Sequence, residues 1–103
     1  MSEALILSMA GDKQNAETIA SDLVESGLAA CVNIIPGIQS VYRWQGKVCR
    51  ENEYLLVVKT RAENFASVRD RILQLHSYEL PEIVMFDINK GYEPYLRWIA
   101  ENS

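Results

Sequence analysis

The fold of this chain is decided by residues 29–58, which read AACVNIIPGIQSVYRWQGKVCRENEYLLVV. The residues before Pro36 form an apolar run that is typical of a strand, and residues 38–44 alternate with the two-residue period of a strand. The Gln-Gly pair ending at Gly46 predicts a tight reversal, because glycine tolerates the backbone angles of a hairpin turn. The chain then returns through residues 48–58. We therefore expect a long two-stranded hairpin with a break at Pro36.

The segment before the hairpin predicts one strand and one helix. Residues 4–9 form a short apolar run that is followed by a turn at Gly11. From Asn15 onward the apolar residues recur at helical spacing, and Gly27 stands where a helix C-cap residue with positive φ belongs. We expect a buried strand followed by a helix that ends just before Gly27.

The segment after the hairpin predicts a second helix, a fourth strand and a final helix. Thr60 and Glu63 have the spacing of a capping box, in which the Thr60 side chain accepts from the Glu63 amide and the Glu63 carboxylate accepts from the Thr60 amide. We therefore expect a helix to start there and to end near His76. Residues 83–88 read as a strand, and residues 92–99 read as a short helix with a proline in its first turn.

The resulting order, β-α-β-β-α-β plus a terminal helix, predicts an α+β fold. With right-handed crossovers it gives the ferredoxin-like sandwich, a four-stranded antiparallel sheet with two helices on one face. The strands are apolar along nearly their whole length, whereas a solvated sheet face requires polar residues at every second position. One short C-terminal helix cannot cover four strands. We infer that a homo-oligomer buries the second face.

Length and composition place the chain among small folded proteins. It has 103 residues, of which 49% are apolar and 23% charged, and we expect one domain covering residues 1–103. Ten basic and 14 acidic residues give a net charge of −4, and the basic residues are scattered, which argues against nucleic-acid binding. No stretch approaches the about 20 apolar residues of a membrane span, and no leader-like segment stands out. We therefore expect a cytoplasmic protein with no membrane partner.

Several motifs follow one another along the chain. They are Ala30-Cys31-Val32-Asn33, Ser40-x-Tyr42-x-Trp44-x-Gly46, Glu51-x-Glu53 leading to Lys59-Thr60, His76-Ser77-Tyr78-Glu79-x-Pro81-Glu82-Ile83, and Tyr95-Leu96-x-Trp98-Ile99. Their order and spacing resemble the CutA family of divalent-cation tolerance proteins over essentially the whole chain. The sequence departs from the family pattern at Ser77, where proline is usual, and at Ser8 and Leu75, where some members carry a cysteine and a second histidine. The resemblance implies a homotrimer, similar in assembly to the PII signalling proteins, that binds divalent metal ions, copper above all.

The only histidine, His76, is the first candidate for a metal ligand, because a neutral imidazole is the commonest protein ligand of copper and zinc. In a trimer, three copies of His76, or one copy with Cys31 or Glu79, could converge on copper or another divalent transition metal that folding does not require. The competing interpretations are that His76 caps the end of its helix and that Cys31 packs in the core as a small hydrophobe.

A second candidate site is a cleft between subunits. Lys59 ends a central strand after four apolar residues, a position from which a lysine often points into a cleft. With Lys59, Tyr78 and Trp44 as its polar and aromatic walls, this cleft would bind a small anion or metabolite, as in a PII-like sensor. The alternative is that Lys59 forms a salt bridge at the interface.

The sequence carries no motif of a known enzyme class: no P-loop, no G-x-G-x-x-G, no nucleophile elbow and no spaced catalytic triad. Glu51 and Glu53 lie on one side of a strand, and Glu79 and Glu82 flank a proline. For both pairs we favour solvated or salt-bridged roles over acid–base catalysis. We therefore expect a protein that is not an enzyme.

Overall fold

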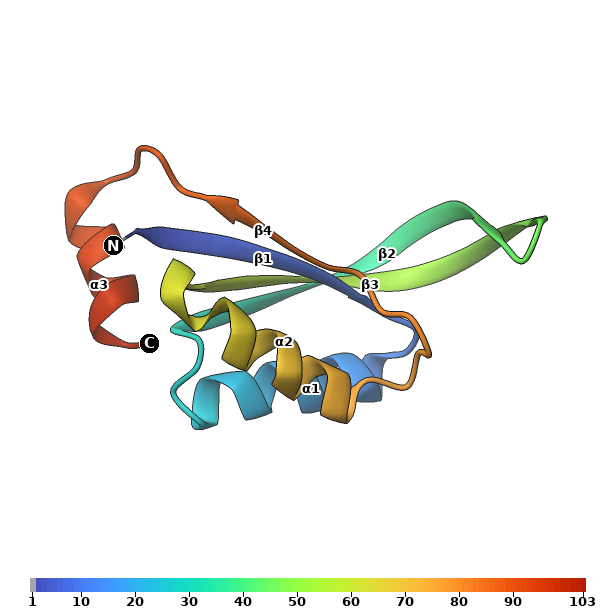
Figure 1. Cartoon of the computed structure of the whole chain (residues 1–103), viewed down its shortest axis with the longest axis horizontal. Coiled ribbons are helices and arrows are strands. Elements are labelled where there is room, and N and C mark those ends of the chain that lie inside the picture. Colours follow the sequence, from blue (N-terminus) through green and yellow to red (C-terminus); the bar gives the residue numbers. More distant parts are fainter. Residues whose placement is uncertain (1) are drawn as a thin grey trace.

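Residues 2–103 are described by a computed structural model, and the chain forms one sheet with its two longer helices on one face (Figure 1). Its elements, in chain order, are β1 (Glu3–Ala10), α1 (Lys13–Glu25), β2 (Cys31–Trp44), β3 (Lys47–Arg61), the 3-10 turn η1 (Ala62–Asn64), α2 (Phe65–Leu75), β4 (Ile83–Asp87) and α3 (Glu93–Glu101). The strands are antiparallel in the order β2-β3-β1-β4. The predicted α+β, ferredoxin-like arrangement with an extra C-terminal helix is confirmed. Among residues 2–103, no helix combines the length and apolar character needed to span a membrane.

The hydrophobic core lies between the sheet and the helices α1 and α2. Burial alternates along β1, so that Ile6 is fully buried while Leu5 and Leu7 face the other side of the sheet. Each of the two helices contributes one apolar stripe. The large, fully buried side chains of this core are Ile6, Ile19, Leu23, Leu56, Val58, Val68 and Ile72. Each stabilises the fold by roughly 1.5–3 kcal/mol through its burial, which keeps both helices on one face.

The long hairpin is confirmed, and its outer part extends past the sheet. The β1–β3 pairing ends at Ala10 opposite Tyr54, and beyond this point β2 and β3 pair only with each other. We call these residues, 38–53, the arm, and Figure 1 shows it projecting from the body. At its tip, Gln45 and Gly46 have φ of 50° and 79°, the positive values of a two-residue hairpin turn. The predicted break is a bulge between Ile35 and Ile38.

Of the two predicted helix termini, the one at Gly27 is confirmed and the one at Thr60 is wrong. Gly27 has a φ of 78° just after α1, as predicted. The predicted capping box at Thr60 and Glu63 does not form, because β3 continues to Arg61 and places Thr60 in the sheet. The Thr60 hydroxyl donates to the Leu28 carbonyl (2.7 Å), and the Glu63 carboxylate pairs with Arg61 instead (2.9 Å). The chain then passes through η1 before α2 begins at Phe65, so tertiary pairing overrides the local capping signal.

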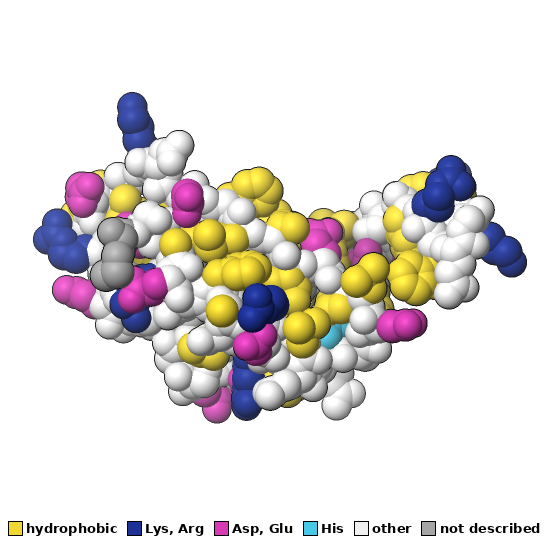
Figure 2. Space-filling view, viewed as in Figure 1, with side chains coloured by type: hydrophobic (Ala, Val, Ile, Leu, Met, Phe, Trp, Pro, Cys, Tyr) yellow, Lys and Arg dark blue, Asp and Glu magenta, His cyan; other side chains and the backbone are white. Residues whose placement is uncertain are grey.

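The second face of the sheet is apolar and largely uncovered in the single chain. We call it the open face. Residues paired across the strands share a side, which places on this face Leu5, Leu7, Met9, Cys31, Asn33, Ile35, Leu55, Val57, Lys59, Val84 and Phe86. Phe86 is 56% exposed and Val84 41%. Figure 2 shows hydrophobic side chains gathered over the middle of the molecule. The helix α3 reaches only one corner of the open face, where Tyr95 lies beside Lys59.

Candidate functional site

His76 lies at the C-cap of α2, and backbone groups engage both of its ring nitrogens. The amide of Tyr78 donates to Nδ1 (3.0 Å), and Nε2 contacts the carbonyl oxygen of Met9. Both contacts are satisfied when Nε2 carries the proton and Nδ1 holds the lone pair. His76 therefore ties the segment after α2 to the end of β1, and neither ring nitrogen bonds a carbonyl of α2, as the helix-capping interpretation of the side chain would require.

Tyr78 connects this segment to the arm. Its phenol donates to Oε2 of Glu53 (2.7 Å), a carboxylate in a residue that is only 8% exposed. Burial, followed by the hydrogen bond to Glu53, raises the pKa of Tyr78. The Tyr78 ring also packs against His76, with centroids 4.7 Å apart. A Cβ at Gly11 would lie 2.7 Å from the Tyr78 hydroxyl oxygen, so this close approach requires glycine.

A second phenol–carboxylate pair lies further out on the arm. Tyr42 donates to Oε1 of Glu51 (3.0 Å), and this hydrogen bond raises the pKa of Tyr42. Both residues are exposed. The predicted solvated role therefore suits Glu51, but it was wrong for Glu53, which is buried and receives its hydrogen bond from a segment 25 positions away.

The residues predicted to bind metal do not assemble within one chain. Glu79 is exposed and lies in the same loop as His76. Cys31 pairs with Lys59, which pairs with Leu5, whereas His76 contacts Met9. Four strand residues at about 3.3 Å each separate these positions by roughly 13 Å along β1 alone. Within residues 2–103, no three His, Cys, Asp or Glu side chains converge in a way that would hold a metal ion.

Cys31 also lies outside the core. It begins β2 and is partly exposed on the open face, so its predicted role as a core residue was wrong. Cys49 is likewise a partly exposed free thiol, on the arm opposite Tyr42.

The three residues predicted to line a cleft are spread along the hairpin. The Lys59 ammonium lies 5.6 Å from the centroid of the Tyr95 ring, at the corner that α3 reaches. Tyr78 contacts Glu53, six residues or roughly 20 Å away along β3, and Trp44 lies about as far again, at the tip of the arm. One chain therefore does not gather Lys59, Tyr78 and Trp44. In the described part of the chain, Lys59 has no carboxylate within ion-pair distance.

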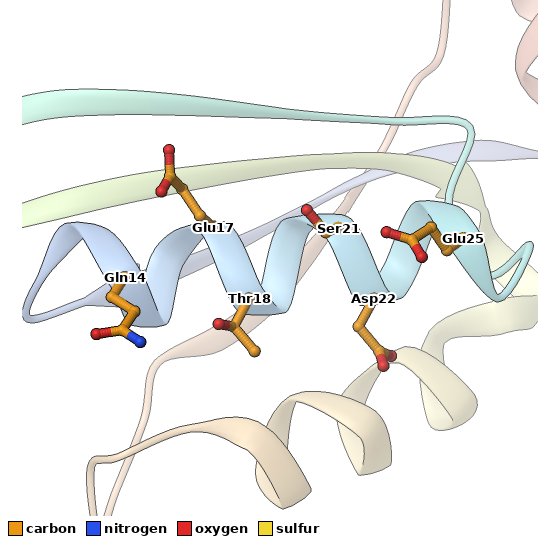
Figure 3. Close-up of a pocket in the computed structure, with 6 residues that line it drawn as sticks. All are labelled: Gln14, Glu17, Thr18, Ser21, Asp22 and Glu25. Carbon is orange, nitrogen blue, oxygen red and sulfur yellow. The ribbon is translucent and has the colours of Figure 1, made fainter.

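A shallow depression runs along the solvent side of α1. Its lining residues are Gln14, Glu17, Thr18, Ser21, Asp22 and Glu25. Figure 3 shows Glu17 and Asp22 pointing in opposite directions, with Asp22 directed toward α2, where it pairs with Arg71 (2.5 Å). Because its carboxylates diverge, this depression does not form a cation site.

Sequence reasoning missed the contact between Tyr78 and Glu53. The sequence holds one weak signal of it, since Glu53 directly precedes the five apolar residues Tyr54 to Val58 and thus stands where a strand enters the core. No neighbouring residue in the sequence identifies Tyr78 as its hydrogen-bond partner. The register of β1 against β3 allows the contact between Tyr78 and Glu53, because β1 ends opposite Tyr54 and Glu53 is the first β3 residue beyond that end.

Comparison with known proteins gives a consistent result. The family model described as CutA1 divalent ion tolerance protein matches residues 4–102. The divalent-cation tolerance protein CutA of Thermus thermophilus is 46% identical over 98% of this chain and 98% of its own length. Its solved structure superposes with a TM-score of 0.95 over 98% of both chains. The CutA homolog of Xenopus laevis is 42% identical over 84% of this chain, which spans only 57% of that longer protein.

Proposed function

The chain belongs to the CutA1 divalent ion tolerance protein family, and from this premise we propose that it is a non-enzymatic homotrimer that binds transition-metal ions such as Cu(II). The main observation in support of the homotrimer is the apolar open face. Large apolar side chains such as Phe86 and Val84 stay exposed there in the single chain, and patches of this kind on soluble proteins usually mark an interface. The arm, whose outer edges have unpaired backbone groups, offers a second contact.

Within this proposal, His76 is the nitrogen donor and Glu79 is the oxygen donor beside it. Metal binding competes with the two backbone contacts of the imidazole. A ring nitrogen that accepts from a backbone N–H, or that donates its own proton to a carbonyl, has no free lone pair for a metal. We therefore expect weak affinity in a single chain. Cys31 is a separate soft donor on the open face, where a neighbouring copy would bring further ligands to it.

Two measurements test this function. Light scattering at micromolar concentration should give the mass of three chains, and calorimetric titration with Cu(II) should show binding that His76→Ala weakens at least about tenfold. Glu79→Gln should weaken binding less, because a single carboxylate contributes less than the imidazole. The Glu25→Gln variant is the matched control on an exposed carboxylate outside the site. A monomer would contradict the assembly, and equal affinity of wild type and His76→Ala would exclude His76 as the ligand.

Lys59 favours a second candidate, a PII-like sensor that binds a small anion or metabolite between subunits. Its ammonium lies on the face that the trimer would bury, next to Tyr95 and without a carboxylate in the described chain. An uncompensated buried charge costs several kcal/mol, so an anion or a carboxylate from a neighbouring copy would stabilise it. Thermal-shift measurements with phosphate and with Cu(II), on wild type and Lys59→Met, separate the two candidates, because a ligand raises Tm only of the protein that binds it.

A further inference from the structure

The two sides of the arm differ in charge. Pairing across the strands places on one side Ile38, Ser40, Tyr42, Trp44, Lys47, Cys49, Glu51 and Glu53, and on the other side Gln39, Val41, Arg43, Val48, Arg50 and Asn52. We call the first set the inner side and the second set the outer side. Both carboxylates of the arm lie on the inner side, and both of its arginines lie on the outer side. The two sides would therefore bring different charges to a neighbouring surface.

The inner side of the arm continues the open face. The bulge lies in β2, so β3 alternates without a break, and Glu51 and Glu53 share the side of Lys59. Tyr42 and Trp44 on the inner side are each 38% exposed, as are comparable apolar side chains on the open face. A copy of the chain that covers the open face of its neighbour therefore also meets the inner side of an arm.

Lys59 is the charge that such an interface has to accommodate. Among the described residues that make up the open face, it is the only charged one. Its ammonium lies 5.6 Å from the centroid of the Tyr95 ring, and no carboxylate of the described chain lies within ion-pair distance. Burying an unpaired charge is strongly unfavourable, so a stable assembly needs a carboxylate close to Lys59.

Glu51 is the inner-side carboxylate that is free to act across an interface. Glu53 is only 8% exposed and receives the hydrogen bond of the Tyr78 phenol (2.7 Å). Glu51 is exposed, and in the described chain only its Oε1 is engaged, by the Tyr42 phenol (3.0 Å). Lys59 and Glu51 of one chain lie eight residues apart on β3, or roughly 26 Å at about 3.3 Å per residue. The two can therefore pair only between copies.

We propose that Glu51 on the inner side of one arm pairs with Lys59 on the open face of the neighbouring copy. This inference rests on the homotrimer of the proposed function and involves no metal. The outer side of the arm does not fit the same place, because it would bring Arg43 and Arg50 toward Lys59. The contact is head-to-tail, so a ring of three copies gives every Lys59 one Glu51. The pair thus determines which side of the arm faces the neighbour.

Charge reversal tests this pair. Lys59→Glu and Glu51→Lys should each weaken association at least about tenfold, because each brings two like charges together across the interface. The double variant restores opposite charges and should associate within about threefold of wild type. Glu17→Lys, on the exposed side of α1, makes the same change of charge and is the matched control. Combined with Lys59→Glu, it should restore nothing. Sedimentation over a dilution series measures all of these variants.

Mixing the two single variants shows that the pair lies between copies. Each variant alone places like charges at every interface, whereas a copy of one variant meets a copy of the other with opposite charges. Native mass spectrometry of the mixture should therefore show trimers that contain both variants in excess over a random distribution. A random distribution would overturn the pair.

The remaining outcomes separate the pair from the assembly. If wild type is a trimer but the double variant does not recover, or if Glu17→Lys rescues Lys59→Glu equally well, the pair is overturned and the trimer stands. A monomeric wild type contradicts both. Should either reversed variant not fold, Lys59→Met and Glu51→Gln replace them, and additive effects of these two changes on association would overturn the pair.

Discussion

The phenol of Tyr78 and the carboxylate of Glu53, 25 positions apart, are joined by a hydrogen bond of 2.7 Å. This contact explains how a glutamate with 8% exposure is accommodated where the arm leaves the sheet. Its donor comes from the segment that also positions His76, so the candidate metal ligand and the root of the arm belong to one network.

The half-buried phenol of Tyr78 should resist ionisation at alkaline pH. Burial and the Glu53 hydrogen bond raise the pKa of Tyr78, and a group with a raised pKa contributes stability that is full below its unfolded pKa, about 10, and is lost as pH rises through the folded value. We expect absorbance at 295 nm to show one tyrosine that titrates last, together with loss of structure above about pH 10. Tyr78→Phe should lack this last component. If the component persists in Tyr78→Phe, the assignment is wrong.

The open face should control assembly. Phe86 on β4 and Leu73 on α2 have similar exposure in the single chain, 56% and 52%, but only Phe86 lies on the open face. Phe86→Asp should weaken association at least about 100-fold, because it places an unpaired charge in the interface, whereas Leu73→Asp should leave it intact. Light scattering over a dilution series measures both. Equal effects of the two variants would show that the open face is not the interface.

Thr60 should contribute strongly to stability although it caps no helix. Its hydroxyl is fully buried, donates to the Leu28 carbonyl (2.7 Å) and accepts from the Asn64 side chain (3.1 Å). Thr60→Val keeps the shape but leaves both partners unsatisfied, so we expect the free energy of unfolding to fall by about 1–3 kcal/mol in urea titrations. Thr18→Val, on the exposed side of α1, should change it by less than about 0.5 kcal/mol. A capping role would instead shift helicity at the start of α2.

The pair of Asp22 and Arg71, which links α1 to α2, should add a small acid sensitivity. Hydrogen bonding from Arg71 lowers the pKa of Asp22. A carboxyl with a lowered pKa stabilises the fold above its unfolded pKa of about 3.9, and this stability is lost as pH falls through the folded value. Thermal melts between pH 5 and pH 3 should therefore show a shallower decline in Arg71→Met than in wild type. Adding Asp22→Asn to Arg71→Met should change the slope no further, and a further change would point to another partner.

The elements were predictable because their signals are local. The alternation around Gly46 and the helical spacing after Asn15 reflect burial on one side of a strand or helix, which neighbouring residues report together. The capping box at Thr60 failed for the opposite reason. Its spacing is correct, but pairing with β1 extends β3 past Thr60, and the hydroxyl then finds the Leu28 carbonyl.

The site was predictable only in part. The lone histidine identified His76 as a candidate, yet the carbonyl of Met9 and the amide of Tyr78 that engage it are set by how the segment after α2 passes the end of β1. Likewise, Cys31 reads as a core residue from its apolar neighbours. Its register opposite Lys59, on the uncovered side, follows only from the position of the bulge and of the hairpin turn.

The bulge at Pro36-Gly37 works as a phase shift within one strand. Two residues of β2 lie there opposite a single residue of β3. Before the bulge, the odd-numbered β2 residues face the open side. After the bulge, the even-numbered β2 residues lie on the same side as Glu51 and Glu53. Deleting Gly37 would leave Pro36 alone opposite Tyr54, so that the ladder would run without a bulge and Tyr42 would stay on the side of Glu51. The extra residue therefore changes the local bend and twist of the hairpin where the arm begins, while the β2 and β3 residues further out keep the same partners.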